Sequence, residues 1–419
     1  MKKGVLNAGQ SLAHGVLSRA GLFLINLLAA RNLQTHDYGV FGFFLSVVAS
    51  LATVAAFGFG VTCNSYVAKF DRTDADYARS VVASCFFFSS LLVIAVSLLC
   101  YPFFRTEAVA GAIGGDIAAW FFVLSLIWLI CIASMGEGTL YGAGAYSVIL
   151  KNSTAVFFIA IPAAYFSIRY FGLYGGILSI LIYRLLFAVG VLRSVKKLGY
   201  LRFREMRSQI FPLRSDIWRI FSKFSLPIAM SGLAAGPIIA IAMNMVIGEE
   251  NGQKQIGLFS WVYQIYLVAV FVPGALSHFF LSKFSKKQEG RLRSFCWSYA
   301  FNLIFSAIVA VNLLFFREPI LFIAGSDYVS SGGAIYNTMA LCVVFCGASA
   351  AFIGFWPAVG RGWMVFGMQF IWAGIIVFAT RFFLKDGGLA LARAFLLAYI
   401  FLAVAQPIVL LHLWKNKAI

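Results

Sequence analysis

Long apolar stretches recur along the whole chain and are separated by short polar joints. Runs such as FFFSSLLVIAVSLLCYPFF (86–104) do not alternate between apolar and polar positions, as the strands of a membrane barrel do. Each stretch is close to the roughly 20 residues that a helix needs to cross a bilayer. The pattern therefore predicts an all-α polytopic membrane protein with twelve transmembrane helices.

The expected spans fall into a first and a second set of six. The first set comprises 11–30, 40–62, 81–103, 117–137, 148–167 and 173–192. The second set comprises 224–247, 257–281, 295–316, 333–356, 363–381 and 389–412. The longest polar stretch, residues 193–223, lies between the two sets. It is too short to form a separate soluble domain, so none is expected.

Composition supports this interpretation. The 419 residues are 62% hydrophobic and 11% charged, whereas ordinary soluble domains carry about 25% charged residues. The first apolar stretch begins after Met1-Lys2-Lys3 and is interrupted by Arg19, so we interpret it as an uncleaved span and not as a signal peptide.

The distribution of Lys and Arg predicts the orientation. With the N-terminus in the cytoplasm, 23 of the 33 Lys and Arg residues fall in cytoplasmic segments and 7 in outer ones. This bias fixes both termini in the cytoplasm by the positive-inside rule. The net charge of +18 then reflects loops lying against anionic lipid headgroups, and no nucleic-acid partner is expected.

Short sequence motifs in the first set of spans recur at corresponding places in the second set. YGVF at the start of the second span has a counterpart in IGLF at the start of the eighth, and Gly172 has a counterpart in Gly388. We therefore expect an N-terminal six-helix half (1–192), a basic cytoplasmic linker (193–223) and a C-terminal six-helix half (224–419). Such parallel repeats are typical of carriers whose halves rock about a central cavity.

Three segments resemble a known family. LSRAGLFLINLLAARNLQTHDYGVFGFFLSV (17–47), FGFGVTCNSYVAKF (57–70) and VPGALSHFFLSKFSK (272–286) resemble the Wzx-type polysaccharide flippases of the multidrug/oligosaccharidyl-lipid/polysaccharide exporter superfamily. Ser18-Arg19 is also similar to the Ser-Arg of the related peptidoglycan-precursor flippases. Those proteins carry a further Arg-Asp pair where this chain has Ile25 and Asn26, which argues against the peptidoglycan role.

The resemblance implies a function. It implies a flippase for undecaprenyl-diphosphate-linked oligosaccharide, such as an O-antigen repeat unit used in lipopolysaccharide biosynthesis, in the bacterial inner membrane. No cofactor is expected; coupling to a proton or sodium gradient, and contact with other polysaccharide assembly proteins, are left open. The alternative is a cation-coupled multidrug antiporter of the same superfamily.

Two arginines inside spans are the main candidates for substrate binding. Arg19 lies in the first span and Arg184 in the sixth. A charge deep in a span costs about 2.5–3.5 kcal/mol on insertion scales and usually faces a protein or water-filled interior. A guanidinium group can donate two parallel hydrogen bonds to the oxygens of a phosphate. The competing interpretation is that Arg19 reaches back to the headgroups with its long side chain.

Four further residues complete the candidate substrate site. Ser18 belongs to the Ser-Arg pair, and Asn26 lies two turns after Arg19. Glu137 lies between two glycines at the end of the fourth span; it either titrates or pairs with an in-span arginine, or it is a solvated helix end. Arg393 lies close to the outer edge, where an anchoring role is favoured.

No pattern predicts an enzyme. The four histidines His14, His36, His278 and His412 lack metal-ligand spacing, and no nucleophile elbow or phosphate loop is present. We therefore expect no catalytic residues and no metal. A drug antiporter would need several buried carboxylates, and Glu137 is the single candidate.

Overall fold

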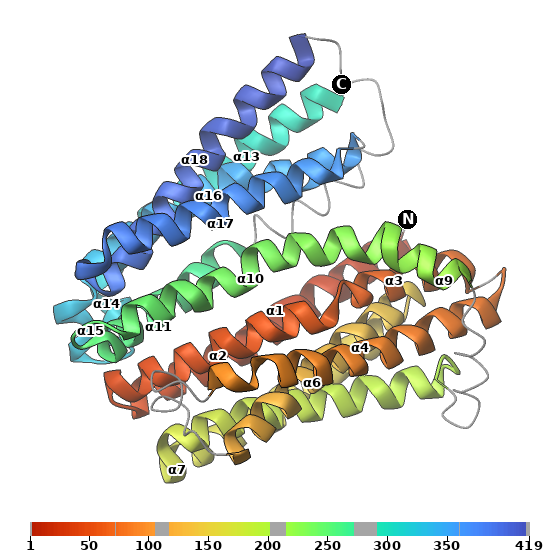
Figure 1. Ribbon diagram of the computed structural model, residues 1–419, viewed down its shortest axis with the longest axis horizontal. Helices are drawn as coiled ribbons and strands as arrows, with labels where there is room; N and C mark the ends of the chain where they lie inside the picture. Colours follow the sequence, from red (N-terminus) through yellow and green to blue (C-terminus); the bar gives the residue numbers. More distant parts are fainter. Residues whose placement is uncertain are drawn as a thin grey trace. The chain divides into compact units, whose positions relative to one another are not determined.

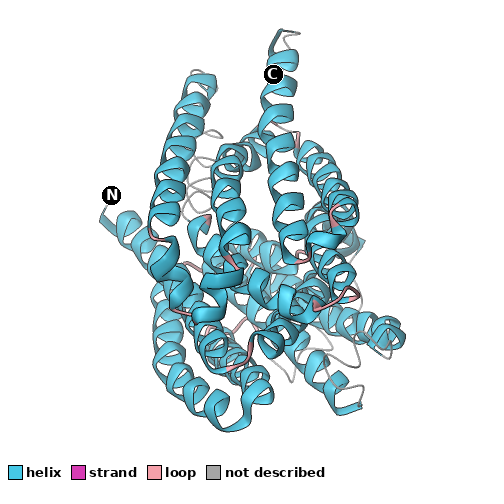
Figure 2. Ribbon diagram, turned by 90° about the vertical axis from the view of Figure 1, so that its left-hand side faces the viewer, coloured by secondary structure: helices cyan, strands magenta, loops and turns pink. Residues whose placement is uncertain are grey.

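The structure is a computed structural model, and it describes residues 2–71, 73–104, 117–201, 215–271, 291–359 and 361–415. Every regular element in these ranges is a helix, and the helices are joined by short loops (Figure 2). Nine of the described helices are long and apolar enough to cross a membrane. The prediction of an all-α multi-span membrane protein is confirmed at this level.

The helices of the first part of the chain agree closely with the expected spans (Figure 1). They are α1 (Lys2–Asn32), α2 (Thr35–Ala56), α3 (Phe59–Phe70), α4 (Ala75–Phe104), α6 (Ile117–Gly142) and α7 (Tyr146–Lys197). The helix α7 contains the expected spans 148–167 and 173–192, with a break in helical geometry at Gly172. Its φ of 55° and ψ of −128° suit glycine, which has no Cβ to clash.

One expected span is wrong in its bounds. The stretch 40–62 was expected to be continuous, but α2 ends at Ala56 and α3 begins at Phe59. Between them Phe57 has a φ of 46° and Gly58 a φ of 70°, and both values are left-handed. The apolar pattern continues across this turn, so hydrophobicity alone gave no signal for it.

The helices of the later part begin with a short α-helix that continues into a π-helical segment. They are α9 (Ser215–Ile220), η1 (Phe221–Ser225), α10 (Leu226–Ile247), α11 (Gly252–Ala269), α13 (Arg291–Phe315), α14 (Arg317–Phe322), α15 (Ser326–Ser331), α16 (Gly333–Ala358), α17 (Gly362–Phe382), η2 (Leu384–Asp386) and α18 (Gly388–Lys415). The motif 272–286, the linker residues 202–214 and the outer segment 105–116 lie outside the described residues. The count of twelve spans stays a prediction.

The chain divides into two units by its internal contacts. The first unit is Met1–Asn32 with Phe44–Pro237, and the second unit is Leu33–Phe43 with Ile238–Ile419. Each unit thus includes a short segment from the other part of the sequence. The six-plus-six division with a linker at 193–223 stays a prediction.

In the first unit, α1 packs on α7, and α6 packs on both α3 and α7. The α3–α6 crossing is close: a Cβ on Gly138 would lie 2.0 Å from the carbonyl oxygen of Gly60. A further contact within this unit joins η1 to α3, since the hydroxyls of Thr62 and Ser225 are 2.8 Å apart. Small residues at crossings allow such close helix packing in membranes.

A polar contact outside the membrane-spanning helices connects the residues that follow α7 to those that follow α3. The Tyr200 hydroxyl donates a hydrogen bond to the Asp71 carboxylate, which follows α3. Burial raises the pKa of Tyr200, and the neighbouring Asp71 charge raises it further. Tyr200 therefore stays protonated as a donor at neutral pH.

In the second unit, α16 contacts α13, α17 and α18, and α11 contacts α16 and α18. The start of α2 crosses α11 closely, because a Cβ on Gly257 would lie 2.0 Å from the carbonyl oxygen of Thr35. A hydrophobic cluster fills the space between α13, α16 and α18; its buried members are Phe295, Ala351, Phe352, Phe355, Trp356 and Leu410.

Candidate functional site

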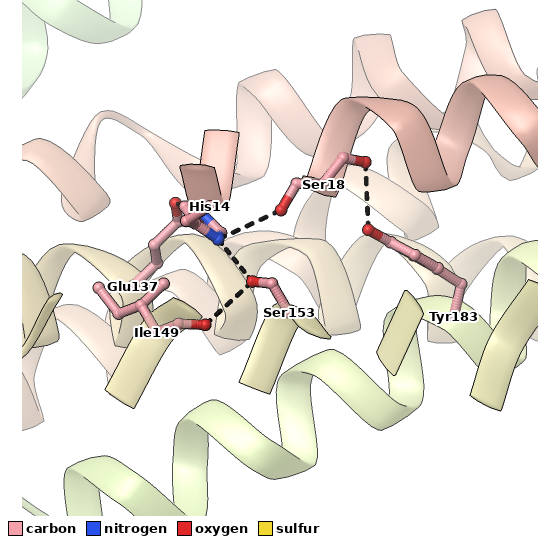
Figure 3. Close-up of polar contacts among 6 residues, drawn as sticks. All are labelled: His14, Ser18, Glu137, Ile149, Ser153 and Tyr183. Carbon is pink, nitrogen blue, oxygen red and sulfur yellow. Dashed lines mark hydrogen bonds and ion pairs between the residues drawn. The ribbon is translucent and has the colours of Figure 1, made fainter. Parts of the chain in front are cut away.

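The helices α1, α6 and α7 of the first unit bring together a cluster of polar side chains (Figure 3). Two of its members, Ser18 and Glu137, were predicted from the sequence as site residues. The centre of the cluster is His14 of α1, whose residue surface is only 3% exposed. His14 was not among the predicted site residues.

Both ring nitrogens of His14 have partners. Nε2 lies 2.7 Å from Glu137 Oε1 on α6, and Nδ1 lies 2.5 Å from Ser153 Oγ on α7. The Ser18 hydroxyl lies 3.3 Å from Nδ1, one turn further along α1. Ser153 Oγ is also 3.0 Å from the carbonyl oxygen of Ile149 on its own helix. The histidine is therefore held by hydrogen bonds from three helices.

Aromatic side chains enclose the imidazole. The ring of Phe187 stacks on it at a centroid distance of 5.9 Å and an interplanar angle of 10°. Tyr141 lies edge-on, at 6.1 Å and 66°. These rings keep lipid and water from the histidine, whereas the Glu137 side chain remains 30% exposed.

A second contact between α1 and α7 lies one turn beyond His14. The Tyr183 hydroxyl donates a hydrogen bond of 3.1 Å to the carbonyl oxygen of Ser18. Gly21 makes room for this ring, because a Cβ there would lie 2.9 Å from Tyr183 Cε2. Arg19 follows Ser18 and Arg184 follows Tyr183, so this contact brings the two predicted arginines to the same level of the unit.

The two arginines differ in their surroundings. Arg19 is exposed, while Arg184 is partly buried and interacts electrostatically with Glu137. The Nε atom of Arg184 is fully buried and has no hydrogen-bond partner among the described residues. A buried donor without a partner is unfavourable and is suited to receive an acceptor from a ligand.

Two further predicted site residues are not part of this cluster. Asn26 is buried in α1, and its Nδ2 donates a 2.9 Å hydrogen bond to the carbonyl oxygen of Leu22 on the same helix. Arg393 belongs to the second unit, where it pairs with Asp386 and lies 5.4 Å from the centroid of the Phe383 ring. The contacts of Arg393 agree with anchoring at a helix end.

The cluster can hold and move protons but offers little to a metal. A histidine, a carboxylate and hydroxyl groups in direct contact are the usual components of proton-binding sites. Within the part of the chain that the structure describes, no group of three or more His, Cys, Asp and Glu side chains could hold a metal ion.

The sequence did contain a signal for the missed residues. His14 and Ser18 are four residues apart in one helix, so they share a face, and both lie in a span next to Arg19. Ser153 is likewise a polar residue inside an expected span, the fifth (148–167). The pairing of His14 with Glu137 joins residues more than a hundred positions apart, and no periodicity reveals such a contact.

The helices and this buried polar site define a polytopic helical membrane protein. Among solved structures, an inward-facing multidrug resistance MATE family transporter of the MOP superfamily is similar, with a TM-score of 0.76 and 13% identity, covering 97% of this chain and 99% of that one. The lipid II flippase MurJ in an inward closed conformation is similar as well, with a TM-score of 0.74 and 19% identity, covering 97% of this chain and 87% of that one.

Sequence comparison adds a distant relationship. The chain is 23% identical over 402 residues to the EPS I polysaccharide export inner membrane protein EpsE of Ralstonia solanacearum, covering 92% of this chain and 89% of that protein. The EpsE of Ralstonia nicotianae is equally similar, with 23% identity over 403 residues. No family model matches the chain. The chain is thus a distant homologue of EpsE with the fold of MOP superfamily transporters, which confirms the predicted resemblance.

Proposed function

We propose that this protein is a flippase that moves undecaprenyl-diphosphate-linked oligosaccharide, an O-antigen or similar repeat unit, across the bacterial inner membrane by alternating access. Two findings support this: the transporter fold, and the distant homology to a polysaccharide export inner membrane protein. The proposal includes twelve spans, both termini in the cytoplasm, and two six-helix halves around a central cavity.

The observation that carries the proposal is the excess of positive charge on α1 and α7. Arg19 and Arg184 lie at one level of the first unit, and Glu137, which faces the same region, is already paired with His14. A diphosphate headgroup brings two negative charges and several acceptor oxygens. Charge-assisted hydrogen bonds from arginine to such oxygens contribute about 1.5–3 kcal/mol each.

The same charge balance disfavours the alternative of a cation-coupled multidrug antiporter. A cationic drug requires carboxylates in its binding site, and the surplus of arginine would repel it. The substrate-contacting residues in this proposal are Arg19 and Arg184, with Ser18, Glu137 and Asn26 nearby in the first unit; Arg393 of the second unit has no part in them.

The proposal is tested by complementation of a flippase-null strain. Arg19→Ala should reduce surface polysaccharide by about tenfold or more, since one charge-assisted contact is lost. Arg19→Lys should restore part of it, because the charge remains while the planar fork does not. Arg393→Ala is the matched control and should leave transport close to wild type.

Membrane levels must be checked for each variant by immunoblotting. Full restoration of surface polysaccharide by a normally inserted Arg19→Ala protein contradicts the proposal, because Arg19 then only reaches the headgroup region. Equal loss in Arg19→Ala and Arg393→Ala also contradicts it, since a general loss of positive charge would then explain the phenotype.

A further inference from the structure

A histidine in direct contact with a carboxylate inside a membrane-spanning bundle is unusual. The His14 side chain is 4% exposed and the Glu137 side chain is 30% exposed. Ionisable residues within spans are rare, expensive and most often functional. Glu137 forms the exposed side of the pair, and His14 the buried side.

The hydrogen bonds around His14 can be satisfied with and without an added proton. When the imidazole is neutral, Nε2–H donates to Glu137, and the Ser153 hydroxyl donates to Nδ1. When the imidazole is protonated, Nδ1–H donates to Ser153 Oγ, and the Ser153 hydroxyl turns to donate to the carbonyl oxygen of Ile149, 3.0 Å away. A rotation of one hydroxyl thus converts the site between the two states without moving heavy atoms.

Charged and titratable groups face the pair from each helix that packs around it. The helix α6 contributes Tyr141 beside His14, and α7 contributes Arg184 and Tyr183, which both interact electrostatically with Glu137. On α1, Arg19 lies five residues after His14 and is exposed. Glu137 in its unpaired anionic form attracts Arg184. A proton on His14 makes the imidazole positive, and this charge offsets the negative charge of Glu137. The positive potential that Arg184 presents to an anion is then higher.

We propose that the His14–Glu137 pair binds one proton from water and that its occupancy strengthens the binding of an anionic headgroup by the arginines of the first unit. The identity of the anion rests on the function proposed above, whereas the proton site itself does not. Because coupling between two binding sites is reciprocal, binding of the anion also promotes uptake of the proton.

The first arm of the experiment observes His14 without any ligand. The full-length protein, labelled at histidine with ¹⁵N and reconstituted in nanodiscs, is titrated by NMR from about pH 5 to about pH 9. His14 is assigned by the loss of its signal in His14→Gln. We expect His14 to change protonation within this range and its midpoint to move to lower pH in Glu137→Gln, because the carboxylate that stabilises the imidazolium is gone.

The control is the other histidine–carboxylate pair. His36 lies 3.3 Å from Asp37, and both side chains are exposed, at 61% and 45%. His36→Gln should leave the titration of His14 unchanged. A His14 signal that stays neutral over the whole range, or a midpoint that is the same in Glu137→Gln and wild type, overturns the proposal.

The second arm measures the linkage to an anion. The probe is undecaprenyl-diphosphate-linked N-acetylglucosamine, a diphosphate diester that lacks the second ionisation of a phosphate monoester near pH 6. Wild type and His36→Gln should bind it at least about fivefold more tightly at low than at high pH, the lower limit of typical couplings. His14→Gln should bind with the same affinity at both.

The outcomes separate the two proposals. If wild type does not bind the probe while His14 titrates as expected, the proposed substrate is wrong and the proton site stands. If wild type binds the probe with equal affinity at both pH values, the linkage is overturned and the proposed function stands.

Discussion

The two units of the molecule differ in where their charged side chains lie. In the first unit, a histidine, a carboxylate and two arginines lie on α1, α6 and α7 within the spans. In the second unit, the described charged residues lie in loops or near helix ends. The buried polar side chains of α13 and α18 there, such as Asn302 and Gln406, are uncharged, and one cluster between α13, α16 and α18 is aromatic and aliphatic. On the function proposed above, we therefore assign the binding chemistry to the first unit.

The aromatic cluster of the second unit is closely packed. The Phe295 ring lies 4.9 Å from Phe352 and 4.5 Å from Phe355, measured between centroids. Such offset contacts, repeated around one cluster, allow few alternative packings.

What the units share is close glycine packing, and replacing a glycine there should have the largest effect on stability. Gly138→Ala in the first unit and Gly257→Ala in the second each place a Cβ about 2.0 Å from a backbone oxygen. We expect each to lower the free energy of unfolding by about 3 kcal/mol, because backbone can yield little. Thermal unfolding in detergent measures this.

The control for both is Gly374→Ala in α17, where a Cβ would meet no atom within 4 Å. This change should be neutral or slightly stabilising, since alanine favours a helix. Equal stability of all three variants contradicts the glycine crossings in both units.

The next largest effect is expected in the aromatic cluster. Phe352→Ala removes a ring that is 1% exposed and contacts Phe295, Tyr299 and Trp356. Loss of these contacts should lower stability by about 3 kcal/mol, the lower end of the range for such truncations, while transport per inserted molecule stays near normal. Phe352→Leu should cost less than about 1.5 kcal/mol. A specific loss of transport at full stability would place binding chemistry in the second unit as well.

A smaller effect on stability is expected for the histidine of the first unit. His14→Phe keeps a ring against Phe187 but leaves Glu137 and Ser153 without their partner. We expect a loss of about 1–2 kcal/mol, since Glu137 is partly exposed and regains water. The measurement is thermal unfolding beside transport, and His36→Phe serves as the control. Loss of stability without any change in the pH dependence of transport would reduce His14 to a structural role.

The smallest effect is expected at the charged pair of the second unit. Arg393 and Asp386 have side chains that are 42% and 38% exposed. Exposed ion pairs contribute about 0–1 kcal/mol, so Arg393→Gln should change the midpoint of thermal unfolding by no more than a few degrees. A strong loss of transport in this variant would mean that the charge of the second unit also contacts substrate.

Much of the helical architecture follows from the sequence because each span needs its own run of apolar residues. The expected span 333–356 became α16 (Gly333–Ala358), and 389–412 became α18 (Gly388–Lys415). The turn at Phe57–Gly58 was missed because its residues are as apolar as their neighbours. Backbone conformation is set there by local packing and leaves no hydrophobic signature.

The site was predictable only in part. A charge in a span is conspicuous, so Arg19, Arg184 and Glu137 could be selected from the sequence with the energetic argument alone. The partner of Glu137 could not, because an arginine and a histidine are equally plausible from composition. The structure selects His14, since α1 places it against α6 at 2.7 Å.

The most direct test of the account is a flipping assay in proteoliposomes with a fluorescent undecaprenyl-diphosphate-linked sugar. The double variant Arg19→Gln with Arg184→Gln removes two positive charges from the spans of the first unit, and Arg381→Gln with Arg393→Gln removes two positive charges from the second. The account predicts at least about a tenfold lower flipping rate for the first double variant and a rate within about twofold of wild type for the second. Equal rates for the two double variants would contradict the assignment of anion binding to the first unit.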